Sequence, residues 1–406
     1  MFRRHILPVS AAVILALSLL TIAVALPFVS TARADQAPGF GLRLNLMINN
    51  DVTPLLNAAQ IMRVDWLAQD VKWKDIEPQA GQYKWEKMDA MIVAVRPYGF
   101  RLLLSVYGTP VWARVSGSDP TRDAPPANPA TFARFMSVML KRYEGLIGAV
   151  EIYPESNLSA RWSSPDGISP ERYVELLKPA YTAIHAAAPT VIVIGGSLAP
   201  TASNDGKTAI DDLIYYKRMY KAGAANYFDA LGVRVDGHNN PPKDFVGSKS
   251  AATTTYKNSS AFYFRHYEDV YAVMVENGDK DKKLWITSAG WASSTEKISG
   301  KEFALDVDEQ QQAEYLTGAV ELAQSQPYIA ALVINNFNYS TSLEGDPSGL
   351  YSLIRSDWSA RPALLKLAQA RQEMAATSFT PNANTSAQHV LPNWRPRQRP
   401  TFGSKP

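Results

Sequence analysis

Short apolar segments rich in branched residues alternate with longer amphipathic segments along most of the chain. Apolar runs of roughly four to eight residues favour buried strands, whereas apolar positions three and four residues apart favour helices that cover a sheet. The alternation is typical of repeated strand–helix units with a parallel sheet. It predicts eight strands, at residues 41–48, 61–66, 101–106, 148–153, 191–196, 230–235, 283–287 and 330–334.

Helical patterns fill most of the gaps between these strands. They lie at residues 85–98, 129–143, 170–188, 209–222, 262–277 and 309–326, with a last helix from 361 to about 375. Eight such repeats predict an α/β fold, a single (β/α)8 TIM barrel over residues 35–377. The longer connections mostly follow predicted strands, where loops of this architecture build active sites.

The N-terminus indicates export. Arg3 and Arg4 precede an uncharged, mostly apolar stretch at residues 6–28, and small residues before Asp35 fit a cleavage site. Residues 1–34 are therefore expected to be a signal peptide or an uncleaved signal anchor, which places the protein outside the cytoplasm, either secreted or anchored in a membrane through residues 6–28.

The C-terminal residues 378–406 differ from the rest of the chain in composition. They are rich in Pro, Asn, Ser and Arg and contain no acidic residue. Such a segment cannot bury enough apolar surface to offset the entropy of ordering it, so we expect a disordered tail.

Composition narrows the function classes. The formal net charge is +3 over 406 residues, and the basic residues form no stripe, so we expect no nucleic-acid partner and favour a neutral or weakly charged one. There are no cysteines, and the five histidines lack metal-ligand spacing. Without a glycine-rich phosphate loop or dinucleotide fingerprint, we expect no metal and no cofactor.

The end of the fourth predicted strand carries the first candidate for chemistry. Period-two alternation places Glu151, Tyr153 and Glu155 on the side that faces the barrel interior, with Glu155 at the rim. A rim carboxylate among aromatic residues can have a raised pKa and act as a general acid. The alternative is an exposed loop glutamate. Glu151 is expected to be a buried structural partner, with Arg63 as a candidate cation.

Five segments, in the same order over some three hundred residues, resemble the secreted bacterial barrels of glycoside hydrolase clan A, near the β-xylosidase and iduronidase type. They read VKWKDIEPQAGQYKWEKMDAM (71–91), LLLSVYGTPVWA (102–113), NPATFARFM (128–136), FDALG (228–232) and SDWSARPALLKL (356–367). The resemblance implies a TIM barrel that acts on O-glycosidic bonds of oligosaccharides or polysaccharides. The family's strand-four motif, W-N-E-P-N, maps its acid/base glutamate onto Glu155.

The strand-end motifs depart from that family. Its strand-seven motif reads roughly T-E-F-G-W with the glutamate as nucleophile, whereas this chain has Ser288 there. Pro154 replaces an asparagine that contacts the sugar, and proline has no N–H to donate. The strand-six segment contains Arg234, and the strand-eight region contains Asn336. The segments that resemble the family's scaffold are retained, whereas the catalytic motifs are degenerate. We therefore expect that the family's chemistry is changed or abandoned in this protein.

Three routes would keep hydrolysis. Ser288 would need an adjacent base to act as nucleophile, and its motif contains no histidine. Asp236 would serve as an alternative base with Glu155 as acid in an inverting reaction, at a separation of roughly 6.5–9.5 Å. A substrate acetamido group would also replace the missing carboxylate.

Two functions of different class follow, and both predict a carbohydrate cleft at the strand ends. One is an exported glycoside hydrolase; the other is a non-catalytic glycan-binding protein on a hydrolase scaffold. A third reading, a scaffold for protein contacts, would require the 237–260 loop to fill the cleft. Residues expected to bind substrate are Trp112, Asn157, Trp162, Arg234, Trp291 and Asn336.

Overall fold

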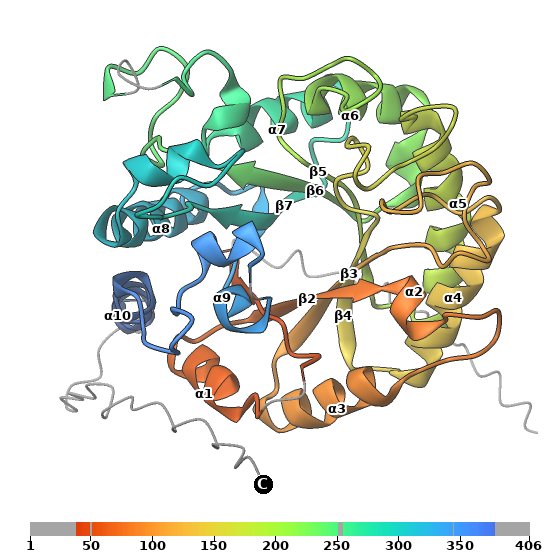
Figure 1. Ribbon diagram of the computed structural model, residues 1–406, viewed down its shortest axis with the longest axis horizontal. Coiled ribbons are helices and arrows are strands. Elements are labelled where there is room, and N and C mark those ends of the chain that lie inside the picture. Colours follow the sequence, from red (N-terminus) through yellow and green to blue (C-terminus); the bar gives the residue numbers. More distant parts are fainter. Residues whose placement is uncertain (1–37, 49–50, 251–254, 344, 378–406) are drawn as a thin grey trace, which may run out of the picture. The chain divides into compact units, whose positions relative to one another are not determined.

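The computed structural model describes residues 38–48, 51–250, 255–343 and 345–377. In this part of the chain eight parallel strands pair in sequence order, and β1 also pairs with β8, which closes the barrel (Figure 1). The predicted (β/α)8 barrel is therefore confirmed. The strands are β1 (Gly39–Arg43), β2 (Trp66–Lys72), β3 (Arg101–Tyr107), β4 (Ile147–Ile152), β5 (Ile192–Leu198), β6 (Ala230–Asp236), β7 (Lys283–Gly290) and β8 (Ile329–Ile334).

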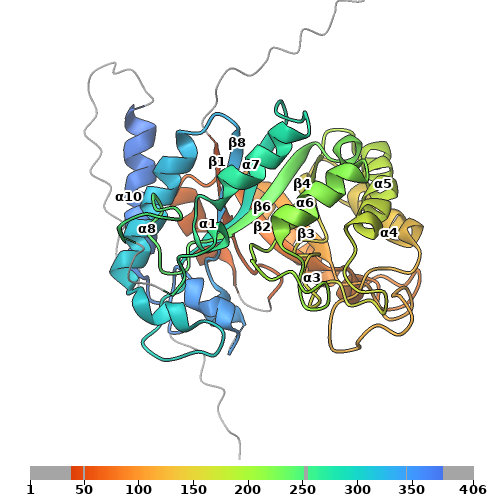
Figure 2. The same ribbon diagram turned by 90° about the horizontal axis from the view of Figure 1, so that it is seen from above.

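Helices surround the strands in both side and end views (Figures 1 and 2). They are α1 (Thr53–Ile61), α2 (Trp73–Ile76), α3 (Glu86–Val95), α4 (Pro129–Arg142), α5 (Pro170–Ala187), α6 (Asp212–Lys221), α7 (His266–Glu276), α8 (Glu309–Gln324), α9 (Tyr339–Ser342) and α10 (Pro362–Thr377).

Several helices begin where the sequence supplies capping chemistry. Asn128 accepts a hydrogen bond from the backbone N–H of Ala130, and a proline follows it at the first helical position of α4. Asp308 and Gln311 form a reciprocal capping box at the start of α8. These local signals explain why the predicted starts of both helices agree with the structure within one or two residues.

The second strand was predicted in the wrong place. Residues 61–66 were expected to be a strand, but Ile61 ends α1 and the strand starts at Trp66. The helix α1 was missed because its apolar positions run directly into those of the next element. The consequence is that the C-terminal tip of β2 lies at Lys72, several residues further along the chain than predicted.

The barrel interior has an apolar lower layer. Trp66 and Trp285 meet edge to face there, with ring centroids 4.8 Å apart. Both rings pack inside the barrel and belong to one buried cluster. The other members of this buried cluster are Ala68, Leu103, Ala149, Ile194, Ala230, Ala331 and Val333.

Two predictions about the ends of the chain remain predictions. The signal or anchor segment (1–34) and the C-terminal tail (378–406) lie outside the described residues. In the described ranges, none of the helices combines the length and the apolar character that a bilayer crossing requires.

A buried histidine joins two helices of the outer layer. His266, at the start of α7, contacts Asp212 of α6 through Nε2 at 2.6 Å and Ser260 through Nδ1 at 3.0 Å. Burial alone would lower the pKa of His266, but the charge and hydrogen bonds of Asp212 and Asp269 raise it to about 9. The imidazole is therefore a cation at neutral pH, and this Ser–His–Asp arrangement is a structural clamp, since a protonated histidine cannot act as a base.

We expect the contribution of His266 to stability to be complete below pH 6.5, its ordinary pKa, and to be lost as the pH rises through about 9. The predicted loss is about 3 kcal/mol of unfolding free energy. Denaturant unfolding of the wild type and of His266→Gln between pH 6 and pH 10 measures it. The difference between the two proteins should narrow with pH; a difference that stays constant would contradict the clamp.

Candidate active site

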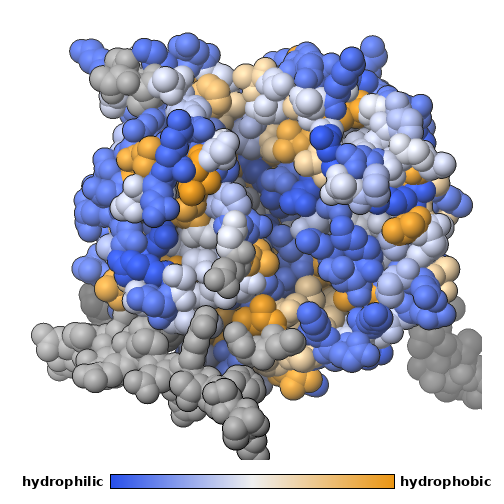
Figure 3. Space-filling model, in the orientation of Figure 1, coloured by the Kyte–Doolittle hydropathy of each residue, from blue (hydrophilic) through white to orange (hydrophobic). Residues whose placement is uncertain are grey.

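A cleft of about 1520 Å³ opens at the C-terminal ends of the strands. Each strand places a residue of its C-terminal tip, or of the segment directly after it, in the lining. Figure 3 shows a hollow on this face with strongly hydrophilic residues in its depth. The tip residues, in strand order, are Arg43, Asp70, Tyr107, Glu155, Ala199, Arg234, Ser288 and Asn335. This is the face on which barrels of this type carry their sites.

The floor of the cleft is a layer of charged side chains above the apolar interior. Glu151 of β4 is fully buried and lies between two arginines, 3.6 Å from Arg43 of β1 and 3.4 Å from Arg234 of β6. Ser105 also donates a hydrogen bond to it. Burial raises the pKa of Glu151, but the charges of Arg234 and Arg43 outweigh this and lower it below the ordinary value. The prediction of a buried structural role fits, with these partners in place of Arg63.

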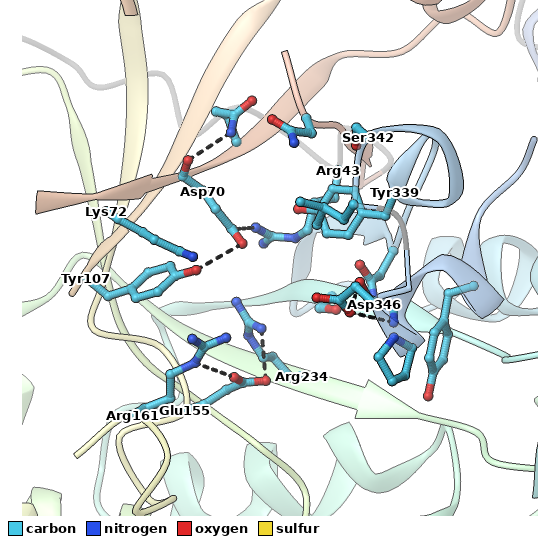
Figure 4. A pocket seen from close by; sticks show the side chains of 18 of the residues that line it. Arg43, Asp70, Lys72, Tyr107, Glu155, Arg161, Arg234, Tyr339, Ser342 and Asp346 are labelled. Carbon is cyan, nitrogen blue, oxygen red and sulfur yellow. Dashed lines mark hydrogen bonds and ion pairs between the residues drawn. The ribbon is translucent and has the colours of Figure 1, made fainter. Parts of the chain in front are cut away.

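Glu155 lies at the rim and is clamped by two guanidinium groups. Nε of Arg161 is 3.0 Å from Oε2, and Nη1 of Arg234 is 3.1 Å from Oε1 (Figure 4). Burial opposes ionisation, but the charges of Arg234 and Arg161 and their hydrogen bonds lower the pKa of Glu155 to about 2. The expected raised pKa is therefore wrong. A carboxylate held in this way is a poor proton donor at neutral pH.

The alternation expected along this segment breaks after Ile152. Tyr153 and Glu155 both have left-handed backbones, with φ of 46° and 60°. Tyr153 consequently packs against Phe132 and Trp162 instead of facing the interior, while Glu155 reaches the cleft. These two left-handed residues therefore change which side chains reach the site. Glu155 lines the cleft because of this backbone geometry, and period-two alternation does not predict it.

The opposite wall supplies no nucleophilic carboxylate at the expected position. Ser288 lines the cleft and is the register partner of Arg234 on the neighbouring strand. Within the described residues, no hydrogen bond joins Ser288 to a histidine, which leaves a serine nucleophile without an oriented base. Asp236 also lines the cleft and accepts hydrogen bonds from the Tyr351 hydroxyl and the His238 backbone N–H.

Two of the tryptophans expected to contact sugar are core residues. Trp162 and Trp291 are 1% and 0% exposed. The indole N–H of Trp291 donates to the Asn240 carbonyl. Trp112 is half-buried, packs edge to face on Trp73 and does not line the cleft. None of these three rings lines the cleft, and burial leaves Trp162 and Trp291 no face for a ligand.

Asn157 and Asn336 are likewise structural. Both are fully buried. The Asn157 side chain bridges the loops after β4 and β5, donating to the carbonyls of Ala199 and Ile210. The amide of Asn336 donates to the Ser348 carbonyl at 2.8 Å. Arg234 is the member of the predicted substrate-binding set that does line the cleft.

Sequence reasoning missed the side chains that dominate the floor. Asp70 and Lys72 line the cleft from β2, and Arg161 lines it from the loop after β4. Correct placement of β2 would have revealed the first two, since residues 66, 68, 70 and 72 alternate onto one face. No local signal marks Arg161, which reaches the cleft through a turn. Among the described residues, no group of three acidic or histidine side chains is arranged to hold a metal ion.

The ionised state of Glu155 makes a pH prediction. Its stabilising contribution should be complete above pH 4.5 and should be lost as the pH falls through about 2. Wild type should exceed Glu155→Gln by about 3 kcal/mol of unfolding free energy at pH 7, and the difference should shrink between pH 4.5 and 2.5.

Glu144→Gln, at an exposed position, is the matched control for this experiment. It should show little difference from wild type at any pH. A Glu155 carboxyl that titrates above pH 5 in carbon-13 NMR would contradict the clamp and restore the general acid.

Solved structures to which this fold is similar include glycoside hydrolases. A family 39 glycoside hydrolase from Bacteroides cellulosilyticus WH2 superposes with a TM-score of 0.61 at 18% identity, over 83% of this chain and 64% of that one. A GH5_18 protein from Streptomyces cattleya, solved with GlcNAc, gives 0.60 at 14% identity over 86% and 83%. Xylanase 10B from Thermotoga petrophila RKU-1, solved with xylobiose, gives 0.53 at 13% identity over 84% and 95%.

These similarities establish the fold. No protein-family model matches the sequence, and a search of curated proteins finds no significant match. The chain spans less than two thirds of the length of the family 39 enzyme. The neighbours belong to the (β/α)8 glycoside hydrolases of clan A, and this chain has the closed eight-strand barrel of that group.

Proposed function

We propose that this protein binds a glycan in the cleft at the strand ends and does not hydrolyse it by the two-carboxylate route. The observation that carries the proposal is the state of the catalytic positions. Glu155 is held ionised between Arg161 and Arg234, and Ser288, at the position that the resemblance gives to the second carboxylate, lines the same cleft. These two positions therefore supply neither a proton donor for the leaving group nor a carboxylate nucleophile for the sugar.

The charges around these positions also oppose the reaction. Glycoside hydrolysis passes through a transition state with positive character on the sugar, which two carboxylates normally stabilise. Here Arg43, Arg161 and Arg234 line the same space. Carboxylates that these arginines neutralise stabilise such a transition state poorly, while the arginine N–H groups suit hydroxyl and carbonyl oxygens of a bound ligand.

Two observations support a carbohydrate as the ligand: the similar solved structures and the open cleft. The neighbours include proteins solved with GlcNAc and with xylobiose. The described part of the 237–260 loop contributes His238 to the lining and leaves the cleft open, which favours ligand binding over a pure protein scaffold. We further propose descent from the β-xylosidase and iduronidase type with degenerate catalytic motifs, and export from the cytoplasm through residues 1–34.

A hydrolase with another pair of carboxylates is the second candidate. Asp70 and Asp236 both line the cleft, from β2 and β6. Neither is free to act, since Asp70 is paired with Arg43 and Asp236 accepts from Tyr351. An inverting reaction would nevertheless need one of them as the base that activates water.

Turnover and binding measured side by side separate the two candidates. We expect no release of aryl groups from aryl glycosides and no cleavage of xylan-type oligosaccharides, together with measurable oligosaccharide binding by calorimetry. Turnover that persists in Glu155→Gln but disappears in Asp70→Asn or Asp236→Asn would instead establish the second candidate. Turnover lost in Glu155→Gln would show that Glu155 is an acid after all.

Restoring a carboxylate at the nucleophile position should not restore hydrolysis. A Glu in Ser288→Glu would lie beside Arg234, its register partner, and form an ion pair with it, while Glu155 would stay ionised. We expect the rate on aryl glycosides to remain within about tenfold of background, which corresponds to about 1.4 kcal/mol of barrier. A gain of several orders of magnitude would mean that one substitution silenced the site.

A further inference from the structure

The floor of the cleft carries an uncompensated positive charge. Four carboxylates, Asp70, Asp123, Glu151 and Glu155, pair in alternation with four cations, namely Arg43, Lys74, Arg161 and Arg234. Lys72, the last residue of β2, also lines the cleft and belongs to none of these pairs. We propose that the cleft contains a subsite for a negatively charged substituent of a glycan, a carboxylate or a sulfate, formed by Lys72 and Arg161. This inference rests on the proposed function.

Lys72 is available for a ligand. Its side chain is exposed, and within the described ranges it makes no ion pair or hydrogen bond. Figure 4 shows it extending from β2 into the cleft beside Asp70 and Tyr107, and in this view the Tyr107 ring lies between Lys72 and Arg161. The nearest carboxylate on its own strand, Asp70, already accepts from Arg43 and from the hydroxyl of Tyr107. The ammonium group therefore faces the cleft with its three donors uncommitted.

Arg161 offers a second, rigid donor that lines the same cleft. Its Nε donates to Glu155 and its Nη1 to Asp123, while no described residue accepts from Nη2. The guanidinium group also stacks over the ring of Tyr107, 4.6 Å from its centroid. These contacts hold the side chain in place, so Nη2 is already oriented. Little conformational entropy of Arg161 is lost when a ligand accepts a hydrogen bond from it.

The distribution of charge over the rest of the lining differs from one side of the cleft to the other. Lys84 and Lys87 lie on the wall near Lys72, but Asp75 and Glu86 accompany them, so this part of the wall adds no large net charge. The other side contributes Asp346 from the segment after α9 and Asp236 from β6, together with Lys301, whose ammonium lies 4.0 Å from Asp236. A negatively charged substituent thus fits at Lys72, and hydroxyl groups fit this mixed polar side.

An anion can bind at this subsite without any change in the ion pairs that Glu155 makes with Arg161 and Arg234. Nη2 of Arg161 and the ammonium of Lys72 are separate from the atoms that hold Glu155. Carboxylates and sulfates are the glycan groups that accept such charge-assisted hydrogen bonds. The whole-chain net charge of +3 did not suggest this preference, because the excess is local.

Matched pairs of oligosaccharides that differ in charge test the subsite. The probes are trigalacturonate with its methyl ester, and a sulfated carrageenan tetrasaccharide with its desulfated form. Calorimetry on the full chain should show the charged member of at least one pair binding about tenfold more tightly than its neutral partner. That preference should weaken between 50 mM and 500 mM salt, since the subsite is open to solvent. The pair that shows it distinguishes a carboxylate from a sulfate ligand.

Two substitutions of Lys72 and one control give the test its specificity. Lys72→Met should remove most of the charge preference, and Lys72→Glu should abolish it, while the exposed position leaves the fold intact by circular dichroism. Lys280→Met is the matched control, because Lys280 is exposed in the loop before β7, at the opposite end of the strands. It should bind like wild type.

The outcomes separate this inference from the function on which it rests. Equal binding of charged and neutral members, unchanged in Lys72→Met, would overturn the subsite and leave glycan binding in place. Charge preference that survives Lys72→Met equally overturns the assignment to Lys72. Absence of binding by every charged and neutral probe to the folded protein would count against the proposed function and the subsite together.

Discussion

The site depends on the buried ion pairs of Glu151 with Arg43 and Arg234. A carboxylate with no exposure is tolerated only when cations and hydrogen bonds replace its water. Arg43 supplies one cation and ties itself to Ser105 and the Thr287 carbonyl. Arg234 supplies the other from the far side of the barrel. The triad thus links strands β1, β3, β4, β6 and β7 above the apolar interior, and removal of any member takes one charged partner from a side chain that is buried.

That constraint reaches the chemistry through Arg234. One arm of its guanidinium group is fixed by Glu151, so the other arm is held where Glu155 meets it. A second cation, Arg161, meets the same carboxylate from the loop after β4. The resulting loss of proton-donor character in Glu155 is therefore not a local accident of one loop. It follows from the need to neutralise a carboxylate that lies one layer deeper in the barrel.

The sequence predicted the parts of this structure that depend on short-range pattern. Strand–helix alternation gave the barrel, and period-two counting placed Glu151 inside it. What failed depends on contacts between distant segments. The strand at β2 was misplaced because the buried positions Met62, Val64 and Trp66 alternate with polar residues through the connection from α1, as in a strand, which hid Asp70 and Lys72. The left-handed residues Tyr153 and Glu155 interrupt an alternation that sequence shows as regular. An aromatic ring can stack on a sugar or pack in a protein core, so the sequence does not distinguish the two roles for Trp162 and Trp291. Both rings are buried in the structure and are core residues.

The proposed loss of hydrolysis and the proposed preference for an anionic ligand would both follow from one change in charge. A retaining site needs two carboxylates around the sugar, and their field repels an anionic substituent placed nearby. Ser288 removes one of those charges, and the two arginines neutralise the other. The remaining Lys72 then sets the sign of the potential that a ligand meets. A return to hydrolysis would require freeing Glu155 from both arginines, and Arg234 could not leave without depriving the buried Glu151 of one of its two cations. The barrel's own stability therefore opposes that return.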